Sequence, residues 1–144
     1  MERGKKVYSS WFIVQSRYCS QFTVENMQTT WKIDYYESST GNKPVEYFIN
    51  TLEEKAQDKI VRTLELLEEF GITIGLPHVK KLIGTPLWEL RILGSDNLRI
   101  FYIAKGQHSF LLLHAFKKKT QKTERKEIKV ALERLREYKS RKRA

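Results

Sequence analysis

The spacing of apolar residues in the first half of the chain predicts a strand followed by helices. Residues 31–36 alternate between apolar and polar side chains, which is typical of a strand. Apolar residues then recur at helical spacing over 44–70, after a proline suited to the first helical position, and the pattern breaks near 53–55. We therefore expect two consecutive helices or one broken helix. Gly71 is suited to end the last of them, because glycine readily adopts the left-handed backbone found there.

Three strands and a final helix are predicted in the second half. Glycines and prolines over 71–86 predict a loop. Runs rich in apolar residues follow at 87–93, 98–104 and 109–116, separated by short turn sequences. The last run is apolar almost throughout, as expected for a strand buried on both faces. Beyond it, Thr123 is suited to cap a helix.

The resulting order, β-α-α-β-β-β-α, predicts an α+β fold. We expect a small, mainly antiparallel sheet with the helical pair on one face, and a C-terminal helix docked through its apolar stripe. Residues 31–144 form this domain. Residues 1–30 differ, because they are rich in Ser, Thr and Gln and lack a long apolar period. One hypothesis is that Met27 is the natural start and that residues 1–26 are an upstream extension.

Positive charge is concentrated at the C-terminal end of the chain. Residues 117–144 contain 13 Lys or Arg and 4 Asp or Glu, a net charge of +9, whereas the whole chain carries +10. A cationic segment anchored to a buried strand predicts a surface for a polyanion, most readily a nucleic acid. An anionic membrane surface is the competing interpretation, but the segment has few large apolar residues to insert into lipid.

The rest of the composition narrows the class of protein. Cys19 is the only cysteine, so no internal disulfide can form, and no apolar run approaches the length of a transmembrane helix. We expect a cytoplasmic protein without a membrane partner. The sequence has no nucleotide-binding glycine motif, no serine-hydrolase motif and no pair at metal-ligand spacing. We therefore expect no cofactor, no metal and no small-molecule substrate.

Charged residues on the predicted strands are the first candidates for chemistry. Alternation places Glu89 and Arg91 on the face opposite the one that packs on the helices, and Arg99 lies on the next strand. Two guanidinium groups on one sheet face can grip a phosphate bidentately. The alternative is that these residues form ordinary cross-strand pairs on the surface.

Lysines and histidines near that face extend the candidate site. Lys80 and Lys81 are expected in the loop that leads to it, and the basic tract 117–122 leaves the last strand beside it. His78, in the same loop as Lys80, can reach the rim of a cleft as a general acid or base. His114 lies inside the apolar strand and is interpreted as a hydrogen-bonded core residue.

Three motifs in this order of elements resemble the RelE/ParE toxin superfamily. They are LWELR at 87–91, RIFY at 99–102 and LLHAFKKKTQKT at 112–123. The branch they resemble most is that of the phage-derived HigB-like toxins. The resemblance implies a toxin of a type II toxin–antitoxin module, neutralised by a HigA-like helix-turn-helix antitoxin.

The resemblance to RelE and HigB toxins further implies that this chain is a metal-independent mRNA endoribonuclease that acts on the ribosome. In these toxins the 2′-OH of the mRNA attacks the adjacent phosphate and leaves a 2′,3′-cyclic phosphate. By resemblance, Arg91 and Arg99 match basic strand positions that grip the scissile phosphate. Glu89 stands where RelE has a lysine, and would either act as a base or orient Arg91.

The basic segment after the last strand supplies the remaining candidates. By resemblance, Lys118, Lys119 and Lys122 match positions of transition-state stabilisers and leaving-group acids. His78 joins them as a candidate acid or base. The residues expected to contact RNA without taking part in the chemistry are Lys80, Lys81, Lys117, Arg125, Lys126 and Lys129.

Departures from the family pattern keep two other functions open. RelE has an active-site tyrosine in its last helix, where the nearest equivalent here is Ile128, and Glu124 stands where HigB-like sequences usually have proline. The ParE branch shares the fold but inhibits DNA gyrase, and such a toxin would leave mRNA intact. The third interpretation is a non-catalytic RNA- or ribosome-binding module, whose affinity would fall steeply with salt.

Overall fold

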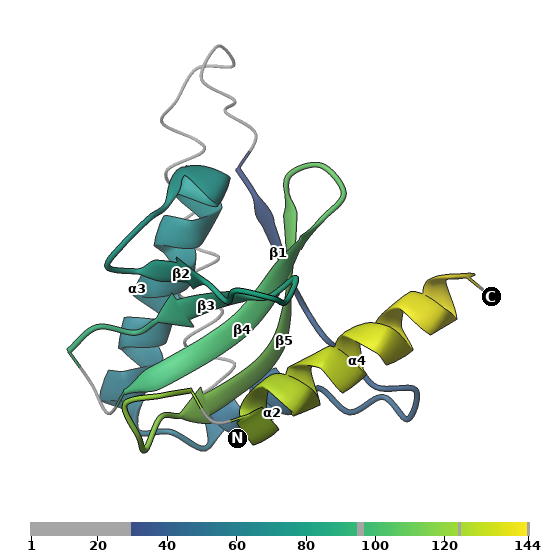
Figure 1. The fold of residues 1–144 in the computed structure, drawn as a ribbon. Helices are drawn as coiled ribbons and strands as arrows, with labels where there is room; N and C mark the ends of the chain where they lie inside the picture. The colour runs from purple at the N-terminus through teal and green to yellow at the C-terminus, as the bar shows by residue number, and fades with distance from the viewer. Residues whose placement is uncertain (1–29, 95–96, 124, 144) are drawn as a thin grey trace, which may run out of the picture.

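The computed structural model describes residues 30–94, 97–123 and 125–143, and these form one five-stranded sheet with helices on both faces (Figure 1). The elements in chain order are β1 (Lys32–Tyr35), α2 (Pro44–Asn50), α3 (Glu54–Phe70), the 3₁₀ turn η2 (Gly71–Thr73), β2 (Val79–Lys81), β3 (Trp88–Arg91), β4 (Leu98–Lys105), β5 (Ser109–Lys117) and α4 (Arg125–Arg143). The hypothesis about Met27 and residues 1–26 falls outside the described residues.

The sheet is mainly antiparallel, as predicted. Its strand order is β1-β5-β4-β3-β2. β1 pairs with β5 in parallel, whereas the β5–β4, β4–β3 and β3–β2 pairs are antiparallel. The interior strand β5 is buried over Phe110–Leu113, as the apolar run indicated. The α+β fold predicted from the sequence is therefore confirmed.

Two separate helices, α2 and α3, cover one face of the sheet. Val45 and Ile49 of α2 and Leu67 of α3 are almost fully buried there, in one cluster with sheet residues such as Leu90 and Leu112. The break between the helices falls at residues 51–53, close to the predicted position.

Gly71 ends α3, as predicted from its freedom to adopt a positive φ. Its φ is +56°, and its backbone N–H donates to the carbonyl of Leu67. A Cβ added at this position would lie 2.1 Å from the indole Nε1 of Trp31. Glycine is therefore required both by the backbone conformation and by the close approach of Trp31.

The C-terminal helix α4 crosses the opposite face of the sheet (Figure 1). Ala131 and Leu135 are buried against Phe101 and Leu111, which is the docking that the apolar stripe predicted. The helix begins at Arg125. Residue 124 lies outside the described residues, so the cap assigned to Thr123 stays a prediction. In the described part of the chain no helix is long and apolar enough to cross a membrane.

The prediction of a continuous loop over 71–86 was wrong, because this segment contains η2 and the edge strand β2. Lys80 and Lys81 therefore lie on a strand, where Lys80 is paired with Glu89 and Lys81 with Trp88. A strand of three residues is too short to show a period of two, and its lysines are typical of a protected sheet edge. Pairing with Glu89 places Lys80 beside the candidate site.

Candidate functional site

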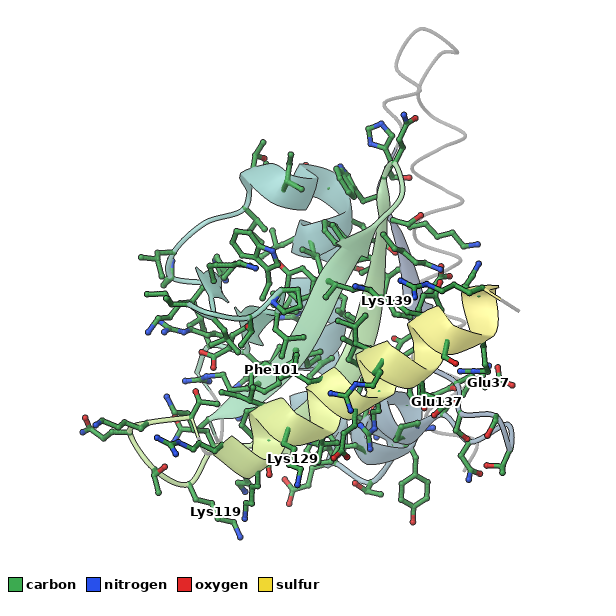
Figure 2. All side chains as sticks on the ribbon, turned by 45° about the vertical axis from the view of Figure 1, so that its right-hand side comes forward. Glu37, Phe101, Lys119, Lys129, Glu137 and Lys139 are labelled. Carbon is green, nitrogen blue, oxygen red and sulfur yellow. The ribbon has the colours of Figure 1, made fainter. Side chains whose placement is uncertain are left out.

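The strand register arranges the candidate residues in two rows across the sheet. In one row Glu89 pairs with Phe101, and Phe101 pairs with His114; in the next, Arg91 pairs with Arg99. The register between β4 and β5 shifts at Phe101/Tyr102, so that Leu113 is an extra residue and His114 faces α4 together with Phe101. Both rows therefore lie on the face that α4 partly covers, and Phe101, which packs in one cluster with residues of α4, marks this face in Figure 2.

Glu89 is the centre of a buried ionic cluster. Its side chain is only 2% exposed. Oε1 accepts a hydrogen bond from Arg91 Nε at 3.2 Å and lies 3.6 Å from Arg99 Nε. Oε2 accepts a hydrogen bond from the hydroxyl of Thr123 at 3.0 Å. One carboxylate thus holds two guanidinium groups side by side, and the cluster keeps a net charge of +1. We call Glu89, Arg91, Arg99 and Thr123 the Glu89 cluster.

The two arginines reach the surface from this buried anchor. The Arg91 side chain is 26% exposed and that of Arg99 is 14% exposed. Arg99 also donates through Nη1 to the carbonyl of Leu98 at 2.9 Å. Burial lowers the pKa of Arg99, with the charge of Arg91 adding to this effect and that of Glu89 opposing it. A partly desolvated guanidinium of this kind gains most from an incoming anion.

His78 lies next to the Glu89 cluster through the β2–β3 pairing. Its carbonyl accepts a hydrogen bond from the backbone N–H of Arg91 at 2.7 Å. The residue is half-buried, and its ring Nδ1 is buried without a hydrogen-bond partner among the described residues. The structure therefore brings His78 and Lys80 to the side of the sheet where Arg91 lies.

The basic tract after β5 does not converge on the Glu89 cluster as a whole. Lys117, Lys118 and Lys119 line a hollow of about 200 Å³ together with Lys126, at the end of β5. Lys119 extends away from the body of the protein (Figure 2). Lys122 does not line this hollow, and it immediately precedes Thr123, which contacts Glu89. The tract is thus divided between two places.

A second, half-buried cluster joins β5 to α4. His114 Nε2 lies 2.5 Å from a carboxylate oxygen of Glu127, and Arg134 Nη1 donates to His114 Nδ1 at 3.0 Å and to the Leu113 carbonyl at 2.9 Å. The prediction of a hydrogen-bonded core histidine is confirmed. Sequence reasoning missed its partners, because a carboxylate and a guanidinium seven residues apart on a charged helix resemble ordinary solvent-exposed residues. Among the described residues, no three His, Cys, Asp or Glu side chains converge as metal ligands would.

These features define a small α+β protein with a mainly antiparallel sheet and helices on both faces, consistent with a RelE-like fold. Two guanidinium groups lie together on one face of this sheet. The family of "Phage derived protein Gp49-like (DUF891)" matches residues 47–136. This match spans more than half of the chain, which therefore belongs to the Gp49-like family, within the RelE/HigB-like toxin superfamily. No curated protein was found to match the sequence.

Proposed function

We propose that this chain is the toxin of a type II toxin–antitoxin module and acts as a ribosome-dependent, metal-independent mRNA endoribonuclease. The observation that carries the proposal is the Glu89 cluster, in which a buried carboxylate holds Arg91 and Arg99 on one face of a Gp49-like fold. Two fixed guanidinium groups suit the dianionic, phosphorane-like transition state of RNA cleavage, because preorganised cations need little rearrangement as charge develops.

In the proposed reaction the mRNA supplies its own nucleophile. The 2′-oxygen bonds to the adjacent phosphorus, the bond from phosphorus to the 5′-oxygen breaks, and the products are a 2′,3′-cyclic phosphate and a 5′-hydroxyl. Arg91 and Arg99 hold the phosphate. His78 is the candidate that accepts the 2′-OH proton, since its carbonyl is already bound to the Arg91 backbone.

Glu89 is assigned an orienting role in this scheme. Both of its carboxylate oxygens already accept hydrogen bonds, and its 2% exposed side chain has no open path to a substrate. The proton for the leaving 5′-oxygen comes from the lysine tract. Its candidates are Lys118, Lys119 and Lys122, and of these three Lys122 is the one that does not line the hollow at the end of β5. Lys122 immediately precedes Thr123, whose hydroxyl donates a hydrogen bond to Glu89.

The proposed partners follow from this activity. mRNA on the ribosome is the substrate, which places the reaction in the cytoplasm, and a HigA-like helix-turn-helix antitoxin neutralises the toxin. Arg125, Lys126 and Lys129 are exposed on the first part of α4 and are proposed to contact RNA, together with Lys80, Lys81 and Lys117. Such contacts add salt-dependent affinity without base specificity.

Inducible expression with mapping of mRNA 5′ ends tests the proposal. Wild-type protein should arrest growth and produce new, translation-dependent 5′ ends. Arg99→Ala should abolish them and Arg99→Lys should restore little, because lysine keeps the charge but not the planar fork. Arg62→Ala, at an exposed arginine on α3, is the matched control and should cleave normally. Arrest with intact mRNA and gyrase–DNA cleavage complexes would instead identify a gyrase inhibitor.

A further inference from the structure

The hollow at the end of β5 is separate from the Glu89 cluster. It is lined by Phe48, Ala115, Phe116, Lys117, Lys118, Lys119, Lys126 and Glu127. No member of the Glu89 cluster lines it. Ala115 belongs to the core layer under α2 and α3, whereas Phe116 belongs to the layer under α4. Because successive strand residues point to opposite faces, the hollow opens where both layers end.

The hollow exists because β1 is shorter than β5. β1 pairs only with residues 109–112 of β5, so within the described chain the rest of β5 has no strand partner on that side. Phe48 of α2 occupies part of this space and forms an apolar wall with Ala115 and Phe116. The rim is formed by lysines from the tract and from the first turn of α4.

The charge of this hollow selects an anion. Four lysines and one carboxylate line it, and that carboxylate, from Glu127, lies 2.5 Å from His114 Nε2. Lysine ammonium groups are point charges with three rotatable donors, so they can bind a phosphate without the planar alignment that a guanidinium group requires. About 200 Å³ is below the usual size of a pocket for a whole cofactor. A single phosphate with its sugar is the matching size.

We propose that this lysine-lined hollow is a second phosphate subsite, which binds a backbone phosphodiester of single-stranded RNA flanking the one held by Arg91 and Arg99. Phe116, which lines the hollow, is paired with Arg99 on the neighbouring strand, so the two places are adjacent and one strand of RNA can occupy both. The proposal rests on the proposed function for the identity of the nucleic acid, but its binding test does not require cleavage.

The test uses the full chain and a ten-nucleotide oligodeoxynucleotide, which lacks the 2′-OH and is not cleaved. Dissociation constants are measured over a range of salt concentrations for wild type, for Lys117→Gln/Lys126→Gln and for the charge-matched control Lys55→Gln/Lys139→Gln. The control lysines are exposed and lie outside the hollow. The hollow variant should lose roughly tenfold in affinity, and its log–log salt slope should decrease by about 0.7 for each phosphate that the variant no longer neutralises. The control should change neither.

Amide NMR spectra locate the ligand. The oligonucleotide should shift the signals of Phe48, Ala115 and Lys126 in wild type, and much less in the hollow variant. Equal losses in the hollow variant and the control would overturn the subsite. The subsite would also be overturned if inorganic phosphate shifted these signals as strongly as the oligonucleotide does at equal phosphate concentration, because the hollow would then bind free phosphate. If the subsite is confirmed while mRNA stays intact in cells, the proposed function fails and the subsite stands.

Discussion

At the scale of single residues, the main feature of this protein is a buried carboxylate with two arginines. Removing one member of a buried ion pair leaves an uncompensated charge, which typically costs about 3–5 kcal/mol. The charge of Glu89 is compensated by Arg91 and Arg99, and its second oxygen accepts a hydrogen bond from Thr123, 34 residues away in sequence. We interpret this arrangement as one that holds the two guanidinium groups in fixed positions.

Glu89→Gln tests whether this carboxylate orients the arginines or accepts a proton. The variant keeps the shape but leaves two guanidinium groups together, so the free energy of unfolding should fall by about 2–4 kcal/mol. Residual cleavage should be at least about 100-fold slower, with an unchanged shape of the pH–rate profile. Denaturant unfolding and single-turnover kinetics measure these effects, and Glu69→Gln, at an exposed glutamate on α3, is the control. Loss of the acidic limb of the profile would identify Glu89 as the base.

His114 should make stability depend on pH. Burial lowers its pKa, the charge of Arg134 adds to this effect, and the hydrogen bond to Glu127 opposes it. Because the pKa in the folded state lies below its ordinary value of about 6.5, the unfolded chain binds the proton more readily. The stabilisation from neutral His114 is therefore present above that pH and is lost as the pH falls.

The measurement is the free energy of unfolding between pH 8 and pH 5. His114→Gln should reduce the pH slope, which for one proton is at most about 1.4 kcal/mol per pH unit. His108→Asn is the matched control, because His108 is exposed and has a positive φ of 60° that asparagine tolerates. An unchanged slope in His114→Gln would show that other groups set the pH dependence.

At the scale of elements, the sequence predicted the helices and strands that are long enough to show periodic apolar residues, and the helix end that is marked by a glycine. The helices α2, α3 and α4 and the strands β4 and β5 follow from apolar spacing, and Gly71 follows from its backbone freedom. The three-residue strand β2 has no readable period, because its formation depends on pairing with β3. The register shift that turns His114 toward α4 also depends on tertiary pairing and has no local signal.

Gly71→Ala tests the end of α3. The added Cβ would meet Trp31 at 2.1 Å, and the positive φ disfavours any residue with a side chain. We expect a loss of at least about 2 kcal/mol in the free energy of unfolding. Gly75→Ala, where no atom lies within 4 Å of the added Cβ and φ is not positive, should be nearly neutral in the same denaturant titration. Similar effects of the two substitutions would contradict this explanation.

Thr123 connects the lysine tract to the sheet, so we expect its hydroxyl to hold the whole loop over residues 118–122 in place. Thr123→Val keeps the size but removes the hydroxyl that donates to Glu89. We expect faster amide hydrogen exchange over residues 118–122 and about tenfold slower cleavage, a loss of roughly 1.4 kcal/mol in transition-state stabilisation. Thr123→Ser should restore both. Normal exchange rates in Thr123→Val would show that the loop is held by other contacts.

At the scale of the whole molecule, the positively charged residues near the C-terminal end of the chain lie on distinct surfaces. The hollow beside Phe48 of α2 is lined by Lys117, Lys118, Lys119 and Lys126. Thr123 is hydrogen-bonded to Glu89, and the rest of the positive charge lies mainly along α4. The sequence separated the tract 117–122 from the helix that follows, but it could not show that Lys126 joins part of this tract at the hollow, because that depends on where β1 ends and where α2 packs. For the same reason it could not show that Thr123 and Glu89, 34 residues apart, are hydrogen-bonded.

The central claim is that this protein cleaves ribosome-bound mRNA at a phosphate held by Arg91 and Arg99 of the Glu89 cluster. The most direct measurement incubates purified protein with ribosomes programmed with a defined mRNA, without added metal beyond that needed by the ribosome, and analyses the product ends. We predict fragments that end in a 2′,3′-cyclic phosphate with wild-type protein, and none with Arg99→Ala or with naked mRNA. Intact ribosome-bound mRNA with wild-type protein, or equal cleavage by Arg99→Ala, would contradict the account.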